Sequence, residues 1–260
     1  MNFHVIGVNH NSAPLEVRER LAVPEAQLPD AIRSLVRQPG VDEGMVLSTC
    51  NRVEVVTSTR QTADLRGFLG SYFGLDAAAL NGHIYEFQQR EAVRHVFRVA
   101  SSLDSMVVGE SQILGQVKEA YAVARGLGAI HSSLEALLSR AFAVAKRVRS
   151  ETAIGSSSVS IASVAVQLAE KIFGSLEGKT VYLVGAGKMA ELAARHLIAH
   201  GAENIIISNR THERAVDLAE SFGGRAVPFE QLHETADHAD IILTSTGASE
   251  PLFRREHGER

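Results

Sequence analysis

The composition of this 260-residue chain, with 45% hydrophobic and 22% charged residues, is that of a globular protein with room for two domains of ordinary size. The formal net charge of −4 argues against broad, non-specific binding to nucleic acid. Local basic clusters could still bind an RNA partner; the alternative is that they are solvated helix faces. We expect no secretory or transit-type leader and no membrane span, because the first residues lack the pattern of a leader and no stretch reaches the ~20 apolar residues that span a bilayer. The single cysteine excludes an internal disulfide and favours a cytoplasmic location.

The first half predicts a mixture of strands and helices. Apolar, β-prone runs predict strands over 3–8, 45–49 and 53–57. Helical periodicity predicts helices over 13–21, 24–37, 64–73, 90–100, 113–125 and 133–149. The second and third strands are expected to meet at a turn, Cys50-Asn51-Arg52, in which the asparagine supplies the turn chemistry.

The second half predicts a parallel sheet. Small and polar residues between 151 and 160 mark a boundary, which gives a first domain over 1–152 and a second over 153–260. Ser158 is the expected cap of the next helix, which Gly174 ends. Strands over 180–184, 204–208 and 240–244 alternate with helices over 188–200 and 211–221. The predicted fold class is therefore α/β, a mixed α+β domain followed by a Rossmann-type parallel-sheet domain that is small or truncated at its C-terminus.

A glycine-rich segment after the strand at 180–184 follows the G-x-G-x-x-G/A pattern of dinucleotide sites. It comprises Gly185, Ala186, Gly187, Lys188, Met189 and Ala190. The first glycine permits a tight turn, the second lets a pyrophosphate approach the backbone, and the small third position lets the helix pack on the strand. The helix N-terminus adds free N–H donors. The alternative is a tight strand-to-helix turn without a ligand.

The next strand indicates which nicotinamide cofactor is bound. An NAD site usually places an acid about 20 residues on, to bind the ribose hydroxyls. Here the strand ends instead in Asn209, Arg210 and Thr211. Because a guanidinium can bind a 2′-phosphate through a fork of donors, the sequence favours NADPH. Arg210 as a solvated residue at a helix start is the alternative.

Cys50 is the candidate nucleophile. A lone cysteine beside a strand is usually inert core, but Arg52 follows two residues later and would favour the thiolate if the segment is extended. A thiolate and a reduced nicotinamide together can reduce an acyl group, because sulfur displaces the ester oxygen and hydride then gives an aldehyde.

The sequence resembles the glutamyl-tRNA reductases over essentially its whole length. The matching stretches are GVNHNSAPLEVRERLA (7–22), STCNRVEV (48–55), AVRHVFRVASSLDSMVVGESQILGQVKEAY (92–121), VGAGKMAELAARHL (184–197), SNRTHERAVDLA (208–219) and ADIILTSTGASEPL (239–252). The resemblance implies NADPH-dependent reduction of L-glutamyl-tRNA(Glu) to glutamate-1-semialdehyde through a cysteine thioester. This reaction is the first step of tetrapyrrole (porphyrin and haem) biosynthesis by the glutamate route.

The resemblance also assigns site residues. Cys50 matches the nucleophile, and His95 matches a histidine important for activity, although on an apolar helix face it would otherwise be a packed core residue. The positions that match substrate contacts are Thr49, Asn51, Arg52, Ser105, Glu110, Ser111, Gln112 and Gln116. Arg52 suits a carboxylate of the glutamyl group. Glu110 and the glutamines could instead cap the helix expected from about residue 113.

The family context implies further expectations. The partners would be glutamyl-tRNA(Glu) and glutamate-1-semialdehyde aminomutase, without a membrane or a metal. Family members are dimers through a C-terminal domain that this sequence lacks, so we expect this chain to be monomeric. Two rival functions remain: a shikimate-type NADP dehydrogenase, and a truncated, non-catalytic paralogue that binds glutamyl-tRNA or NADPH. The first rival has no use for a cysteine in a TCNR motif.

Overall fold

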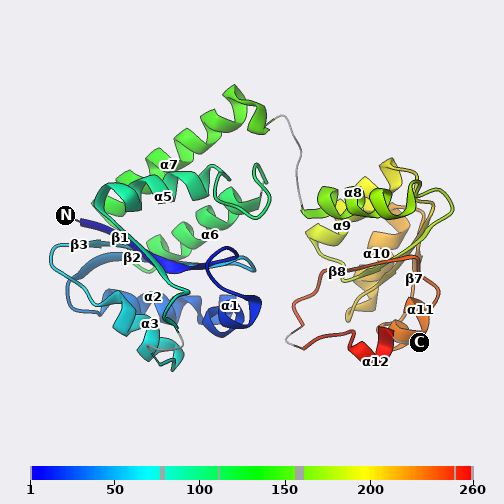
Figure 1. Cartoon of the computed structure of the whole chain (residues 1–260), viewed down its shortest axis with the longest axis horizontal. Coiled ribbons are helices and arrows are strands. Elements are labelled where there is room, and N and C mark those ends of the chain that lie inside the picture. The colour runs from blue at the N-terminus through cyan, green and yellow to red at the C-terminus, as the bar shows by residue number, and fades with distance from the viewer. Residues whose placement is uncertain (1, 77–79, 111, 156–160, 249, 259–260) are drawn as a thin grey trace. The chain divides into compact units, whose positions relative to one another are not determined.

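Separate hydrophobic cores divide the chain into two units, residues 1–159 and residues 160–260, in the computed structural model (Figure 1). The structure describes residues 2–76, 80–110, 112–155, 161–248 and 250–258. Within these ranges, no helix combines the length and the apolar character that crossing a bilayer requires.

The first unit is built on an antiparallel sheet. Its strands are β1 (Asn2–Asn9), β2 (Val41–Ser48), β3 (Arg52–Thr59) and β4 (Tyr85–Gln88), in the order β2-β3-β1-β4. Its helices are α1 (Leu15–Leu21), α2 (Leu28–Val36), α3 (Leu65–Phe73), α5 (Gln89–Ala100), α6 (Gln112–Gly126) and α7 (Ser132–Glu151).

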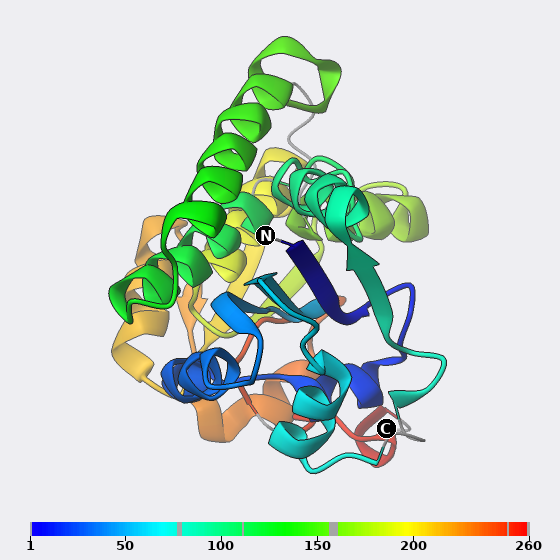
Figure 2. The same cartoon turned by 90° about the vertical axis from the view of Figure 1, so that its left-hand side faces the viewer.

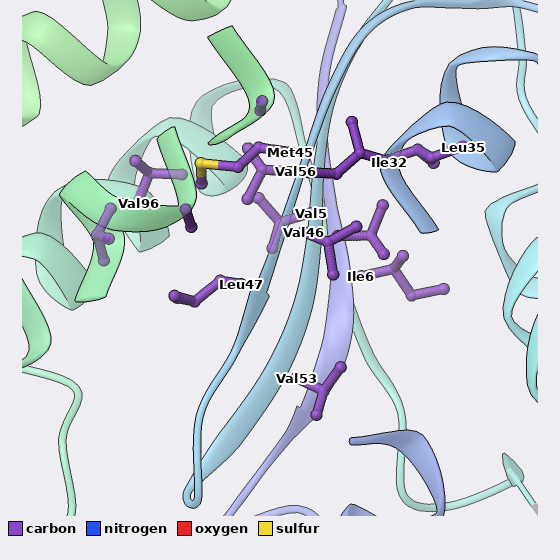
Figure 3. Packing of buried hydrophobic residues seen from close by; sticks show 14 of the residues in the cluster. Val5, Ile6, Ile32, Leu35, Met45, Val46, Leu47, Val53, Val56 and Val96 are labelled. Carbon is purple, nitrogen blue, oxygen red and sulfur yellow. The ribbon is translucent and has the colours of Figure 1, made fainter. Parts of the chain in front are cut away.

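Helices cover both faces of this sheet. The blue and cyan helices α2 and α3 lie on one face, and the green helices α5, α6 and α7 lie on the other (Figures 1 and 2). Ile32 and Leu35 of α2 approach the strands from one side and Val96 of α5 from the other (Figure 3). Every residue of β3 is therefore buried, including polar ones such as Glu54. A polar side chain in this strand must find its partners inside the protein.

Gly7 lies at the centre of the sheet. On β1 it pairs with Glu54 of β3 on one side and with Tyr85 of β4 on the other. A side chain at Gly7 would come within 2.9 Å of the Glu54 Cα and 3.0 Å of its Cγ, and closer still to the carbonyl oxygen of Val53. The absence of a Cβ at this position therefore leaves the space that the Glu54 side chain uses.

The second unit is built on a parallel sheet in the order β7-β6-β5-β8. Its strands are β5 (Thr180–Val184), β6 (Asn204–Ser208), β7 (Arg225–Ala226) and β8 (Ile241–Thr244). Its helices are α8 (Ile161–Phe173), α9 (Lys188–Ala199), α10 (His212–Ser221), α11 (Leu232–Ala236) and α12 (Arg255–Gly258). Alternate residues of β5 face opposite cores: Val181 and Leu183 pack with α8, α9 and α10, whereas Tyr182 and Val184 pack with Leu232 of α11.

Most predicted elements are confirmed within a few residues, and the α/β class is confirmed. The helix expected over 24–37 is wrong at its start, because a 3₁₀ turn over Glu25–Gln27 precedes α2. Pro29 explains the difference, since proline has no N–H and fits the first turn of a helix rather than its interior. The short strands β4 and β7 were not predicted. Helix α8 ends before Gly174 as expected, whereas Ser158 lies outside the described residues.

Glu43 caps the long helix α7 from a neighbouring strand. Its carboxylate accepts hydrogen bonds from the backbone N–H groups of His131 at 2.8 Å and of Ser133 and Leu134 at 2.9 Å. Burial alone would raise the pKa of Glu43, but these donors outweigh burial and lower the pKa below its usual value. The charge therefore stabilises the first unit, because it satisfies free N–H groups at the positive end of a helix.

We expect Glu43→Gln to lower the free energy of unfolding of the first unit by about 2 kcal/mol at neutral pH, the usual contribution of a hydrogen bond to a charged group. Because the folded pKa is lowered, the carboxylate contributes fully above its unfolded pKa and loses its effect as the pH falls through the folded value. Urea unfolding followed by circular dichroism should therefore show a difference in unfolding free energy between the wild type and Glu43→Gln that becomes smaller in acid. Glu119→Gln, at an exposed position on α6, is the control, and equal stabilities of the two variants at neutral pH would contradict the cap.

Candidate functional site

The candidate nucleophile lies on the tight turn between β2 and β3. The Thr49 N–H donates to the Arg52 carbonyl oxygen at 2.8 Å. The Thr49 hydroxyl accepts from the N–H groups of Asn51 at 3.3 Å and Arg52 at 3.1 Å. Thr49, rather than the expected Asn51, therefore supplies the side-chain chemistry of the turn. Cys50 is exposed at its tip, so it is not the buried core cysteine of the alternative interpretation.

Two residues from the start of the chain hold this turn from outside. The His10 N–H donates to the Asn51 carbonyl oxygen at 3.0 Å. Arg18, on α1, donates through Nη1 to the Cys50 carbonyl oxygen at 2.6 Å and to Asn51 Oδ1 at 3.4 Å. The Asn51 side chain therefore contacts Arg18.

The Cys50 thiol is not a preformed thiolate. Desolvation by surrounding protein atoms and the Glu110 carboxylate raise the pKa of Cys50 above its usual value, and Arg18 acts in the opposite direction. Most molecules therefore carry the neutral thiol near pH 7, and the nucleophile must lose its proton during the reaction.

Arg52 does not act on the thiol in the way the sequence suggested. Its guanidinium is only 1% exposed and donates to Glu54 Oε1 at 2.6 Å, to Asp104 Oδ1 at 3.1 Å and to the Asp104 carbonyl oxygen. Burial alone would lower the pKa of Arg52, but Glu54, Tyr85 and Asp104 raise it. The charge of Arg52 is thus compensated inside the protein, and its guanidinium is occupied here rather than presented to a substrate carboxylate.

His95 belongs to the same buried network. Its Nε2 lies 2.7 Å from Glu54 Oε1, and its ring packs on Phe87 and Tyr85. Burial would raise the pKa of Glu54, but Arg52, His95 and the Tyr85 hydroxyl lower it to about 2. Glu54 is therefore ionised and only accepts hydrogen bonds, so His95 must carry its proton on Nε2. With 5% of its surface exposed, His95 is a partnered residue of the interior.

The loop after α5 brings the next predicted residues to the turn. The Ser102 hydroxyl donates to the Glu110 carbonyl oxygen at 2.6 Å, and Arg149 of α7 donates to the same oxygen at 2.7 Å. These contacts fix Glu110, whose carboxylate acts on Cys50. Ser111 lies outside the described residues. Gln112 begins α6, and Gln116 lines a separate cavity of about 220 Å³ beside Leu47 and Ser48.

Two buried polar atoms near the turn have no hydrogen-bond partner within the described parts of the chain. They are His10 Nδ1 and Ser105 Oγ. Burial, reinforced by the Arg52 and Arg18 guanidinium groups, lowers the pKa of His10, so its imidazole is neutral near pH 7. His10 contacts the turn through its backbone, and Ser105 follows Asp104, a partner of Arg52. Buried polar atoms normally have partners, so two orphans on these segments indicate a place for a polar ligand. The sequence analysis predicted Ser105 but missed His10.

In the second unit, the glycine-rich loop has the geometry of a phosphate site. Gly185 has a φ of +111°, and a Cβ there would collide with the Ser245 carbonyl oxygen, so only glycine fits. Gly187 is the N-cap of α9, which Lys188 and Met189 open, and the side chain of Ala190 is buried as the motif requires. Free N–H groups at the N-terminus of a helix such as α9 can bind a pyrophosphate.

A cavity of about 850 Å³ adjoins this loop. Four of the predicted cofactor residues line it: Ala186, Gly187, Asn209 and Arg210. Thr211 is the N-cap of α10, and its carbonyl oxygen accepts from Asn209 Nδ2 at 3.0 Å. Arg214, Ser245 and Thr246 also line the cavity and were missed by the sequence analysis. Arg214 lies in the first turn of α10, four residues after Arg210, which precedes the helix.

The strand order explains why the cavity lies here. From β5 the chain moves outward to β6 and β7, then returns to place β8 on the other side of β5. Dinucleotides bind at such a reversal, outside the carboxyl ends of the strands. The second unit therefore has the fold and the phosphate loop of a domain that binds a nicotinamide dinucleotide, and the first unit presents an exposed thiol. In the described residues, no group of three or more His, Cys, Asp or Glu side chains could hold a metal ion.

Comparisons with known proteins narrow this class to a family. Residues 6–152 match the model of the N-terminal domain of glutamyl-tRNA(Glu) reductase, and residues 167–260 match that of shikimate / quinate 5-dehydrogenase. The chain belongs to the glutamyl-tRNA reductase family. The likeness to the shikimate dehydrogenase family is confined to the second unit.

Among the relatives that match the whole chain are two glutamyl-tRNA reductases. Glutamyl-tRNA reductase 2 of Koribacter versatilis is 64% identical over 261 residues, and the glutamyl-tRNA reductase of Syntrophotalea carbinolica is 50% identical over 264 residues. The glutamyl-tRNA reductase structure from Methanopyrus kandleri is similar over 99% of this chain and 61% of its own, with 38% identity and a TM-score of 0.58. The chain spans about 60% of the length of the two curated relatives.

The opposing effects on the Cys50 thiol give a testable consequence. Because the Glu110 carboxylate raises the pKa of Cys50, we expect Glu110→Gln to lower that pKa and to speed alkylation of Cys50 about twofold to tenfold near neutral pH. Iodoacetamide labelling across a pH series, read by intact mass, reports on Cys50 alone because the chain has no other cysteine. Glu119→Gln is the matched control, and a Glu110→Gln profile that coincides with it would contradict the electrostatic contact.

Proposed function

We propose that this chain carries out NADPH-dependent reduction of glutamyl-tRNA to glutamate-1-semialdehyde, with Cys50 as the nucleophile. The observation that carries the proposal is the exposed Cys50 on a turn fixed by Thr49, Arg18 and His10, in a chain whose second unit has a dinucleotide-type cavity. A reduced thiol is required, which fits the cytoplasmic location favoured by the single cysteine. The aldehyde product is the substrate that an aminomutase partner would consume.

In this reaction Cys50 forms a covalent intermediate. The sulfur attacks the ester carbonyl carbon of the glutamyl group, a C–S bond forms, and the C–O bond to the tRNA ribose breaks. The thiol proton leaves Cys50, and the departing ribose oxygen takes up a proton. Bound NADPH would supply the hydride that turns the thioester into the aldehyde and releases the thiol.

The substrate would be held by the polar groups around the turn. We assign contacts with the glutamyl group or the tRNA end to Thr49, Asn51, Ser105, Glu110, Ser111, Gln112 and Gln116. Glu110, as a carboxylate beside the thiol, suits the ammonium group of the substrate. We assign Arg52 and His95 to the buried network of Glu54. His10 Nδ1 and Ser105 Oγ, which lack partners in the described residues, would gain them from the substrate.

The second unit would hold NADPH. We assign the pyrophosphate to the segment Gly185 to Ala190 at the start of α9, and the 2′-phosphate to Asn209, Arg210 and Thr211. Arg210 and Arg214 both line the cavity, so their guanidinium groups are available for a doubly charged phosphate. We accordingly regard residues 1–152 as the catalytic, glutamyl-tRNA-binding domain and residues 153–260 as the NADPH-binding domain.

The thioester is directly testable. When the protein is incubated without NADPH with tRNA charged with labelled glutamate, we expect one label per chain, removable by hydroxylamine. Cys50→Ala should take up none. Because Cys50 is exposed, the variant should keep its fold, which circular dichroism checks. A hydroxylamine-sensitive label on Cys50→Ala would mean that another group is the acceptor. Absence of label on the wild-type protein would contradict the thioester intermediate.

Cofactor selection depends on Arg210, which lines the cavity. We expect Arg210→Ala to weaken NADPH binding about tenfold to a hundredfold, the equivalent of losing one charge-assisted contact of roughly 1.5–3 kcal/mol. NADH, which lacks the 2′-phosphate, should bind the variant and the wild type alike. Fluorescence titration of both cofactors measures the ratio. Arg195→Ala on α9, outside the cavity lining, is the control. An unchanged preference for NADPH over NADH in Arg210→Ala would mean that other residues bind the 2′-phosphate.

A further inference from the structure

Arg18 makes a contact that neither the proposed reaction nor the family comparison explains. It lies on α1, a different segment from the Cys50 turn, and is half-buried. Its Nη1 donates at 2.6 Å to the carbonyl oxygen of Cys50 itself and at 3.4 Å to Asn51 Oδ1. Its Nε donates at 3.3 Å to the Ala13 carbonyl oxygen just before α1. One guanidinium thus ties the turn of the nucleophile to the start of a helix.

We propose that Arg18 is the positioning residue of the nucleophile: it fixes the backbone of Cys50 and supplies the positive charge next to the thiol. The proposal rests on the proposed role of Cys50. The fork of the guanidinium matters because its Nε and Nη1 atoms reach Ala13 and the Cys50 turn at the same time, which a single ammonium group cannot reproduce. Arg18 acts through Cys50 and does not itself react.

The charges around the thiol explain why this role falls to Arg18. Glu110, from the loop after α5, disfavours the thiolate, and Arg18, from α1, favours it. His10, whose backbone binds Asn51, is neutral because burial and the two guanidinium groups lower its pKa. Arg52 of β3 is paired with Glu54 and Asp104. Among these groups, Arg18 is the cation whose charge reaches the sulfur.

The geometry also suits the chemistry of acyl transfer. The attacking sulfur must approach the ester carbonyl along a narrow range of directions, and a displacement of about 1 Å can cost a hundredfold in rate. Cys50 lies at the exposed tip of a turn, so its position depends on what holds the turn. The bond from Arg18 to its carbonyl oxygen restricts the turn without covering the thiol.

The experiment compares Arg18→Gln, which removes the charge, with Arg18→Lys, which keeps the charge but loses the fork. We expect Arg18→Gln to slow alkylation of Cys50 by iodoacetamide about threefold to tenfold near neutral pH, and to converge with the wild type in strong base, where all sulfur is ionised. Arg18→Lys should be alkylated within about twofold of the wild-type rate. Arg20→Gln, at an exposed position on the same helix, is the matched control.

Transfer of glutamate from charged tRNA to Cys50, measured in a single turnover without NADPH, then reports on positioning. We expect both Arg18 variants to lose at least about tenfold in this rate, while Arg20→Gln keeps the wild-type value. A folded Arg18→Gln with the alkylation profile of the wild type would overturn the electrostatic role. A folded Arg18→Lys with the wild-type transfer rate would overturn the positioning role, and it decides that question even if Arg18→Gln does not fold.

The two measurements also separate this inference from the proposed function. Alkylation needs neither tRNA nor NADPH, so a shifted profile in Arg18→Gln would stand even if wild-type Cys50 accepted no glutamate. In that case the proposed function fails and the contact of Arg18 with the cysteine remains. If wild-type Cys50 accepts glutamate and the Arg18 variants behave like Arg20→Gln, the inference fails and the proposed function remains.

Discussion

The ionised carboxylate of Glu54, buried in the middle of a sheet, is the constraint on which the first unit depends. A charge removed from water costs several kcal/mol unless it is paired and hydrogen-bonded. Glu54 meets this demand with donors from three places: Arg52 on its own strand, Tyr85 on β4 and His95 on α5. Arg52 extends the network to Asp104 in the loop that carries Glu110. The carboxylate therefore holds together the segments from which the site around Cys50 is built.

The two arginines near the Cys50 turn have different partners. Arg52 is buried and pairs with Glu54 and Asp104, whereas Arg18 is half-buried and reaches the backbone of Cys50. Burial and the Glu110 carboxylate raise the pKa of Cys50 and Arg18 acts against them, so the thiol is mostly protonated near neutral pH. A thiol of this kind resists adventitious oxidation better than a permanent thiolate, because the thiolate is the reactive form.

The sequence was sufficient for the parts that depend on local patterns. The glycine loop, the alternating strands of the second unit and the turn at Cys50 follow from spacing and residue type, and the structure has them. Partnerships between distant residues were not predictable. Arg52 lies two residues from Cys50, which suggested a contact, but the buried Glu54 attracts its guanidinium instead. His10 and Arg18 are about 40 and 32 positions from the turn they hold, and only the folded sheet brings them there.

Gly7 has a consequence that reaches beyond its own strand. It lies between Glu54 and Tyr85 in the sheet, and the Glu54 side chain passes within 3.0 Å of the place where a Cβ would be. Any larger residue would act as a wedge between β1 and β3, moving the carboxylate away from its donors. A chain altered there would keep every group that is proposed to touch the substrate. Loss of function would then come from a residue with no side chain at all, by way of the spacing between two strands.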